Sequence, residues 1–454
     1  MTVSDLQTSN VMDDESHPIY EVMQPIRLGG FTKAMTLVDK SNRPNYYGYL
    51  GDIIVPANSV VTNEATNETT NEATNDAQRF KTYLNTKNPF CALAIGVQGT
   101  GKSYSVSAII ENCMIDFKPC IECPSPISTL VLHYDQDIHN MCEAVSMTQL
   151  VPQVKNIHNV KGIKQITVLV SPNYYKMRQS AYKHIPNCVV LPLSFAWHEL
   201  TANQILGLMH VDPSDNMPLY MTRLLVMLRD FQKNSKVVDF ESFKRQLQAL
   251  KFEGGQIGPL QQRLDVIECF LSRTNECDLQ HIFEQGQLVL CDLTDPLLPK
   301  EEVNAIFNVL LEKYIGCKTP NASKMVVLDE AHKYLTEAMD PLSLSVIKAV
   351  RQMRHHGIRV VVSSQSPASI PSELIELSTL VMLHHFHVPD WFQYLKSRLP
   401  MNEKDFEKIR GLKTGEALVY TRQWPDGMDD GRPMKTMMIR NRLTKDSGRT
   451  VASQ

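Results

Sequence analysis

The chain has 454 residues, of which 43% are hydrophobic and 21% charged, as in an ordinary globular protein with room for two or three domains. Its 46 basic and 49 acidic residues give a net charge of -3, which excludes a strongly basic body, so nucleic acid would have to bind through a local patch. No apolar run reaches the roughly 18 residues of a membrane span, so we expect no membrane partner. Residues 1–16 are polar, which does not fit a signal peptide, and we expect an intracellular location, cytoplasmic or nuclear. The ten cysteines are scattered, and we expect them to be reduced thiols.

The first 86 residues differ from the rest of the chain. Short extended pieces, such as the one at 52–55, are separated by glycine and proline, so we expect a small β-rich N-terminal region over residues 1–61. A four-residue repeat of Thr, Asn, Glu and one further residue follows at 62–76. The repeat has almost no apolar surface to bury, and residues 62–86 are therefore predicted to be a low-complexity linker or loop.

From residue 87 onward, short apolar strands alternate with longer helical segments. The predicted strands are 92–95, 130–133, 166–170, 189–191, 288–292, 325–328, 360–363 and 380–383. Apolar runs of this length are typical of parallel strands buried on both faces, and their alternation with helices implies βαβ crossovers. The predicted fold class is therefore α/β, a mostly parallel sheet flanked by helices over residues 87–454. Within it we expect a helical insertion at about 202–277 and a C-terminal β-hairpin and tail at about 412–454.

Residues 96–103, Gly-Val-Gln-Gly-Thr-Gly-Lys-Ser, match the phosphate-binding pattern G-x-x-x-x-G-K-[ST] in full, between a predicted strand and a predicted helix. Glycines let the backbone turn its N–H groups toward phosphates, and the helix N-terminus adds partial positive charge. We expect Lys102 to reach the β- and γ-phosphates of ATP and Ser103 to bind Mg²⁺. The predicted nucleotide contacts are Gly96, Val97, Gln98, Gly99, Thr100, Gly101, Lys102, Ser103 and Tyr104.

A second acidic motif follows the apolar strand predicted at 325–328. Asp329 would stand at the sheet edge and join the Mg²⁺ ligands, and Glu330 would polarise the attacking water. A surface acidic pair that merely closes a strand is the alternative. The presence of the phosphate-binding loop favours the catalytic interpretation, and together the two motifs predict a P-loop nucleoside triphosphatase.

Two further features lie between and after these motifs. Gln365 ends the strand predicted at 360–363, where it could bond both the γ-phosphate and the water, or else only a nearby turn. Arg351 and Arg354 lie three residues apart on the preceding helix and share a face. One of them could stabilise the charge on a neighbouring subunit's nucleotide, but spacing alone leaves open that both are simply solvated.

The order of these motifs resembles the HerA–FtsK superfamily of ring-forming DNA-translocating ATPases, and its HerA-like branch most, over residues 88 to about 450. The resemblance also rests on residues 286–293, on an Arg three residues before Gly357, on Ser-Gln-Ser-Pro at 364–367 and on Leu-Lys-Thr-Gly-Glu-Ala at 412–417. It implies an ATPase with Mg²⁺, a homo-oligomeric, hexameric ring, DNA as a partner, translocase or helicase activity, and a nuclease or other protein as a further partner. It also implies Arg354 as the arginine finger. The family's second arginine is replaced here by His384 and its neighbours.

Several alternatives stay open. The chain could be an ATP-gated switch or assembly module acting on a protein, or a packaging or conjugation motor with the same ATPase core and a different cargo. Asp-Glu-Ala-His at 329–332 also spells the box of DEAH helicases, but 227 residues separate Lys102 from Asp329, so we interpret His332 as incidental. Cys120 and Cys123 have zinc-knuckle spacing without a second pair. The basic tail at 432–449 could track a phosphate backbone, brace a neighbouring subunit or be solvated.

Overall fold

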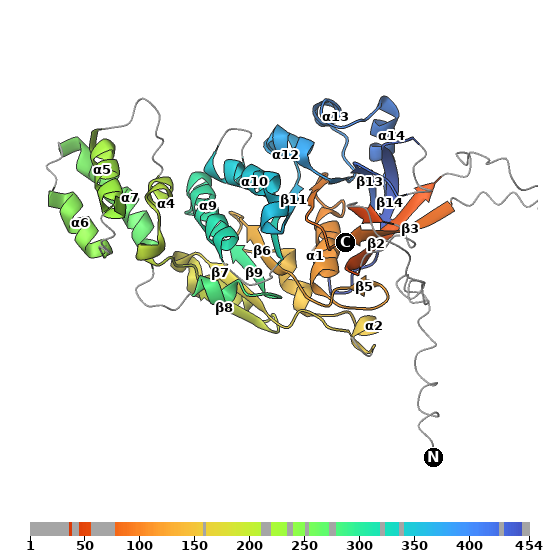
Figure 1. The fold of residues 1–454 in the computed structure, drawn as a ribbon, viewed down its shortest axis with the longest axis horizontal. Coiled ribbons are helices and arrows are strands. Elements are labelled where there is room, and N and C mark those ends of the chain that lie inside the picture. Colours follow the sequence, from red (N-terminus) through yellow and green to blue (C-terminus); the bar gives the residue numbers. More distant parts are fainter. Residues whose placement is uncertain are drawn as a thin grey trace, which may run out of the picture.

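The fold was taken from a computed structural model, which describes the chain in segments (Figure 1). These are residues 36–38, 45–55, 78–157, 160–209, 219–233, 239–249, 254–271, 278–317, 323–335, 340–425 and 431–446. The strands in these segments all join one continuous sheet.

Eight parallel strands form the centre of that sheet, in the order β12-β4-β11-β10-β6-β9-β7-β8. Their bounds are β4 Cys91–Ile95, β6 Ser128–His133, β7 Ile166–Val170, β8 Cys188–Pro192, β9 Leu288–Asp292, β10 Lys324–Leu328, β11 Ile358–Ser364 and β12 Leu380–Leu383. The prediction of all eight strands is confirmed to within two residues at each end. So is the α/β fold class with a mostly parallel sheet.

The parallel strands are apolar throughout because both faces of the sheet are covered. Alternate residues of a strand point to opposite faces. Leu93 belongs to a core that includes helices α9 (Lys300–Gly316) and α10 (Pro341–Arg351), whereas Ala92 and Ala94 belong to a second core with helix α1 (Lys102–Met114). The sheet therefore holds its strand ends rigidly between two hydrophobic layers.

An antiparallel extension continues the sheet beyond β12, in the order β12-β13-β14-β2-β3-β1. The added strands are β1 Leu37–Val38, β2 Tyr47–Val55, β3 Gln78–Asn85, β13 Glu416–Thr421 and β14 Met434–Ile439, and β5 Ile121–Glu122 pairs with β2. The predicted C-terminal hairpin is confirmed as β13 and β14.

The predicted boundary between an N-terminal region and the main domain needs correction. The linker predicted for residues 62–86 is wrong over its last part, because Gln78–Asn85 is strand β3, whose Tyr83 and Leu84 are fully buried. Residues 1–35, 39–44 and 56–77 lie outside the described residues. The N-terminal strands that are described share the sheet of the main domain and form no separate layer.

The predicted helical insertion projects from the end of the sheet that carries β7 and β8 (Figure 1). It contains α4 Ala202–Leu208, α5 Leu219–Lys233, α6 Phe240–Ala249 and α7 Gly254–Cys269. The other helices are α2 Pro152–Lys155, α3 Tyr175–Tyr182, α8 Leu279–Ile282, α11 Met353–His356, α12 Ser372–Leu377, α13 Pro389–Lys396 and α14 Glu403–Gly411. Among the described segments, no helix has the length and apolar character needed to cross a membrane.

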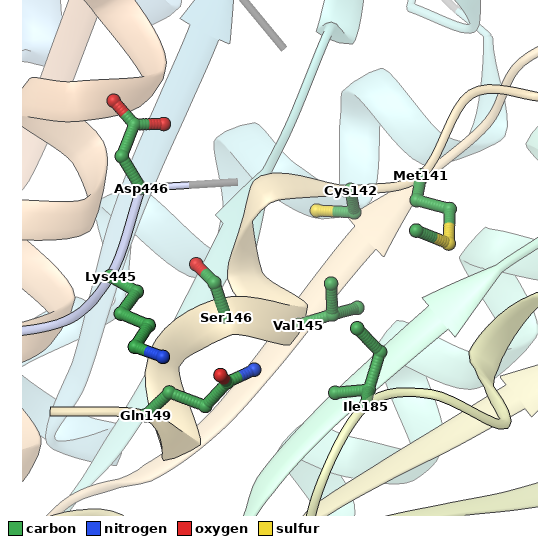
Figure 2. A pocket seen from close by; sticks show the side chains of 8 residues that line it. All are labelled: Met141, Cys142, Val145, Ser146, Gln149, Ile185, Lys445 and Asp446. Carbon is green, nitrogen blue, oxygen red and sulfur yellow. The ribbon is translucent and has the colours of Figure 1, made fainter. Parts of the chain in front are cut away.

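A cavity of about 320 Å³ lies where the segment after β6 meets the end of the tail (Figure 2). It is lined by side chains from 141–149, which includes the 3-10 helix η3 (Glu143–Thr148), and by Ile185, Lys445 and Asp446.

Candidate active site at the carboxyl edge of the parallel strands

The glycine loop leaves the end of β4 and enters α1 directly. Gly99 and Gly101 have φ of 76° and 100°, backbone conformations that side chains strongly disfavour. A Cβ on Gly96 would lie 2.7 Å from the Cβ of His384, so the loop packs too closely there for any other residue. The loop therefore has the tight, glycine-dependent shape that presents backbone N–H groups to phosphates.

Lys102, the first residue of α1, is only 4% exposed. Its Nζ donates a hydrogen bond of 2.8 Å to the carbonyl oxygen of Val97, within the loop. Burial lowers the pKa of Lys102, and the charges of Glu330 and Asp329 act against that shift. The lysine and the two carboxylates therefore share one electrostatic environment. Ser103 follows Lys102 and is half-buried at the same helix end.

Sheet order explains why these distant residues meet. Strand β11 lies between β4 and β10, with Ser364 beside Ile95 and Val362 beside Leu328. All three strands are parallel, so their carboxyl ends open on the same edge. The residues that follow them, the glycine loop, Gln365 and the pair Asp329–Glu330, consequently lie side by side.

Glu330 and Gln365 are joined directly. Gln365 Nε2 donates a hydrogen bond of 2.8 Å to Glu330 Oε2. Burial and the charge of Asp329 raise the pKa of Glu330, while Lys102 and the bond from Gln365 oppose the rise. Glu330 also has a φ of 50°, rare for a residue with a side chain. Strain of this kind persists where the surrounding structure enforces it, and it is often found at functional sites.

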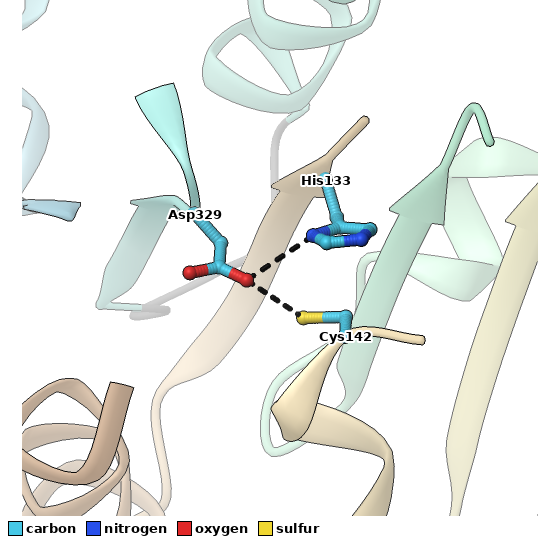
Figure 3. Close-up of side chains that lie close together, drawn as sticks. All are labelled: His133, Cys142 and Asp329. Carbon is cyan, nitrogen blue, oxygen red and sulfur yellow. Dashed lines mark hydrogen bonds and ion pairs between the residues drawn. The ribbon is translucent and has the colours of Figure 1, made fainter. Parts of the chain in front are cut away.

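Asp329 is held by two buried partners that sequence analysis did not anticipate (Figure 3). His133 Nδ1 lies 3.1 Å and Cys142 Sγ 3.3 Å from the same oxygen, Asp329 Oδ2. Burial raises the pKa of Asp329, but the hydrogen bond and charge of His133 outweigh it and hold the pKa below its usual range. Asp329 is therefore an ionised carboxylate fixed in one orientation. Its partners lie 196 and 187 residues away in sequence, so no local pattern could reveal them.

Two further histidines belong to the site. His332, interpreted above as incidental, has its Nδ1 3.5 Å from Glu330 Oε2, and burial and the charge of Lys333 lower its pKa to about 4. His384 is fully buried beneath the glycine loop, with Nε2 3.1 Å from Ser105 Oγ. Burial lowers the pKa of His384 to about 4 as well, so its imidazole is neutral and packs beneath the loop at Gly96. His384 directly follows β12, which pairs with β4, and this pairing places it beneath the loop.

Arg354 lies at the opposite edge of the sheet from the loop. It belongs to α11, just before the amino end of β11, and the seven residues of that strand span about 23 Å. Its side chain is exposed, and it has no hydrogen bond or ion pair to any residue that the structure describes. Arg351, by contrast, pairs with Glu373 at 2.6 Å on the surface. Arg354 therefore cannot serve the nucleotide site of its own chain.

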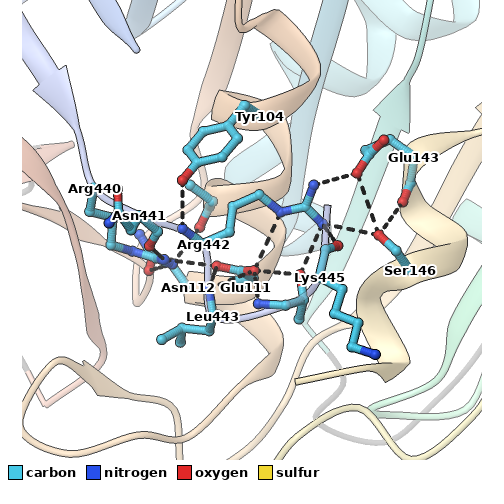
Figure 4. A network of polar contacts seen from close by, with 12 residues as sticks. Tyr104, Glu111, Asn112, Glu143, Ser146, Arg440, Asn441, Arg442, Leu443 and Lys445 are labelled. Atoms are coloured by element: carbon cyan, nitrogen blue, oxygen red, sulfur yellow. Dashed lines mark hydrogen bonds and ion pairs between the residues drawn. The ribbon is translucent and has the colours of Figure 1, made fainter. Parts of the chain in front are cut away.

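The tail after β14 braces helix α1 (Figure 4). Arg440 and Arg442 are 3% and 4% exposed. Arg440 Nη1 donates to Glu111 Oε2 at 2.8 Å, and Arg442 pairs with Glu143. The expectations of a phosphate-tracking, subunit-bracing or solvated tail are therefore wrong for these two arginines, whose charges are neutralised inside the chain.

Tyr104 faces the same tail. Its hydroxyl accepts a hydrogen bond of 2.8 Å from the backbone N–H of Arg442 (Figure 4). The side chain of Tyr104 thus ties the start of α1 to the tail, and its contact with nucleotide stays a prediction.

The residues present fit a metal-bound triphosphate. The loop has the glycine conformations that a phosphate cradle requires, a buried ammonium stands at a helix N-terminus, and Ser103 and Asp329 offer the hard oxygen ligands that Mg²⁺ prefers. Together with the parallel sheet order, this decides the fold. It is the fold of a P-loop nucleoside triphosphatase.

Comparisons with known proteins were made at the level of sequence and of structure. No family model and no curated protein matches the chain in sequence. Among solved structures, the DNA-packaging ATPase B204 from Sulfolobus Turreted Icosahedral Virus is 11% identical with a TM-score of 0.32, over 77% of this chain and 98% of that chain. The plasmid coupling protein TrwB, solved with a non-hydrolysable ATP analogue, is 12% identical with a TM-score of 0.49, over 88% and 96%.

Proposed function

We propose that this chain is a Mg²⁺-dependent ATPase of the HerA–FtsK type that works as an oligomeric ring, of six subunits by the resemblance, and moves or remodels DNA. The observation that carries the proposal is the convergence of Lys102, Asp329 and Glu330 at the ends of strands separated only by β11. A glycine loop alone could bind phosphate without hydrolysing it. The acidic pair beside it would supply a Mg²⁺ ligand, Asp329, and a base for the attacking water, Glu330.

Each side chain has a role in this proposal. Lys102 would exchange its bond to Val97 for one to the β- and γ-phosphates, and the loop's N–H groups would hold the remaining phosphate oxygens. Ser103 and Asp329 would hold Mg²⁺, which neutralises charge on the phosphates when bound. Because His133 and Cys142 both engage Oδ2, Asp329 would offer Oδ1 to the ion or to its water shell.

Glu330 would orient the attacking water and accept its proton. The raised pKa of Glu330 is closer to neutral pH than the pKa of an ordinary glutamate, which suits a general base. Gln365 holds one Glu330 oxygen and would contact the same water or the γ-phosphate. Closure of the loop over the phosphates would exclude bulk water from this edge.

Arg354 supports the oligomeric part of the proposal. Its exposed position at the far edge of the sheet suits a residue that reaches a neighbouring subunit's γ-phosphate. ATP would then lie between subunits, and hydrolysis would move one subunit against the next.

DNA as the substrate rests on the family resemblance of the motifs, so its test must be direct. Steady-state ATPase of the full chain would be measured with duplex DNA, with single-stranded DNA and without nucleic acid, at several salt concentrations. We expect stimulation by DNA that declines as salt rises, because phosphate contacts release counterions. An ATPase rate that DNA does not change at low salt would contradict the proposal of a DNA motor.

The alternative is an ATP-gated switch or assembly module that acts on a protein partner. Burial of Arg440 and Arg442 favours it, because these charges cannot contact nucleic acid from inside the fold. Hydrolysis indifferent to DNA would support this alternative.

A further inference from the structure

The three side chains around Asp329 Oδ2 combine the ligand types of a transition-metal site. They offer an imidazole nitrogen, a thiol sulfur and a carboxylate oxygen, and these three atoms all lie within 4.8 Å of one another (Figure 3). Within the described residues they form the sole such group of three or more His, Cys, Asp or Glu. Cys120 and Cys123, despite their spacing, do not take part in one.

Two of the three separations between these ligand atoms are close to those of a zinc site. Zinc bonds of about 2.0–2.3 Å in tetrahedral geometry place ligand atoms roughly 3.3–3.6 Å apart. The two observed separations, 3.1 Å from His133 Nδ1 to Asp329 Oδ2 and 3.3 Å from Cys142 Sγ to the same oxygen, need to open by only a few tenths of an ångström. Mg²⁺, in contrast, prefers oxygen ligands and does not recruit thiolate.

The cluster is buried, but one member borders open space. His133, Cys142 and Asp329 are 4%, 2% and 7% exposed. Cys142 also lines the cavity of about 320 Å³, which carries the polar side chains of Ser146 and Gln149 (Figure 2). The cavity therefore borders the cluster at the Cys142 side chain.

We propose that His133, Cys142 and Asp329 bind Zn²⁺ or a similar thiophilic divalent cation at Asp329 Oδ2, and that the added positive charge weakens Mg²⁺ binding at Oδ1 of the same carboxylate and inhibits ATP hydrolysis. The inhibitory part rests on the proposed function. On binding, the Cys142 thiol and the His133 imidazolium, whose Nδ1 proton faces Asp329, each release one proton to solvent, and the thiolate sulfur and the Nδ1 of the neutral imidazole bond the metal. A water completes the four ligands.

Cobalt is the spectroscopic probe for this site, because thiolate bound to Co²⁺ gives a charge-transfer absorption in the near ultraviolet. The purified full chain would be titrated with Co²⁺ alone, without nucleotide, and the cobalt then displaced with Zn²⁺. We expect this band in the wild type and in the control Cys317→Ser, whose thiol lies far from the cluster. We expect the band to be absent in Cys142→Ser and weaker in His133→Asn.

Zinc inhibition of Mg²⁺-ATPase would be measured as the zinc concentration that halves each protein's own rate. Cys142→Ser should need at least about tenfold more zinc than the wild type, because it loses one of three ligands. Equal zinc sensitivity of Cys142→Ser and the wild type, or Co²⁺ binding without a Cys142-dependent band, would overturn the proposal. A Cys142-dependent band in a chain that never hydrolyses ATP would uphold the metal site and refute only the proposed function.

Discussion

The two edges of the central parallel strands are built in opposite ways. At the carboxyl edge, Lys102 and Asp329 are buried, and Glu330 is bonded to Gln365. At the amino edge, Arg354 is exposed and has no partner in the described parts of the chain. One edge therefore gathers the residues proposed to bind and hydrolyse ATP, and the other carries an exposed arginine that we propose acts on a neighbouring subunit.

Replacing Arg354 with alanine should cause the largest loss of ATPase activity among the variants that test this comparison of the two edges. If Arg354 stabilises the transition state in a neighbouring subunit, kcat should fall by roughly 10³-fold while nucleotide affinity changes little. Mixing Arg354→Ala chains with Lys102→Ala chains should recover part of the rate, because some interfaces then pair an intact loop with an intact arginine.

Arg351→Ala is the matched control, since Arg351 shares the helix region but already pairs with Glu373. It should hydrolyse ATP at nearly the wild-type rate. An Arg354→Ala chain of full activity, or mixed complexes that co-assemble and recover nothing, would argue against a finger acting between subunits.

The next largest effect is expected where the contacts between the tail and helix α1 are removed. Glu111 is fully buried and accepts bonds from Arg440, from the backbone N–H groups of Leu443 and Thr444 and from the Thr444 hydroxyl. Glu111→Gln would leave the Arg440 charge uncompensated and should cost about 3–5 kcal/mol of unfolding free energy, measured by denaturant titration. Glu373→Gln, which disturbs an exposed pair, should cost less than about 1 kcal/mol. Equal costs for the two variants would contradict the account of the tail as a brace.

The smallest expected effect concerns the pH dependence of turnover. Glu330 must be ionised to accept a proton, and the hydrogen bond from Gln365 favours its ionised form. Removing that bond with Gln365→Leu raises the pKa of Glu330 further, so the acidic limb of the kcat profile should move to higher pH. Gln352→Leu, at the amino edge, should leave the limb in place. A limb that moves to lower pH in Gln365→Leu would mean that another group controls it.

Much of the fold was predictable because its signals are local. The eight parallel strands are continuous apolar runs, and the glycine loop and the acidic pair each follow such a strand. Strand β3 was missed because it follows a polar repeat. Pairing with β2 and β1 and burial of Tyr83 and Leu84 stabilise it.

The candidate site was predictable only in its motif residues. The support of Asp329 by His133 and Cys142 depends on β6 lying beside β10, which no pattern along the chain indicates. The arginines of the tail looked exposed because their partner, Glu111, lies 329 residues away from Arg440 on α1. Charge composition counts residues, but it does not show which charges are neutralised inside the fold.

The most direct test of the central claim is hydrolysis of Mg²⁺-ATP by Glu330→Gln, measured with nucleotide binding to the same preparation. Glutamine preserves the size of the side chain but cannot accept the proton from water. We predict that binding is retained and that turnover falls by at least about 10²-fold. Undiminished hydrolysis by Glu330→Gln would contradict the assignment of this edge of the sheet as the active site.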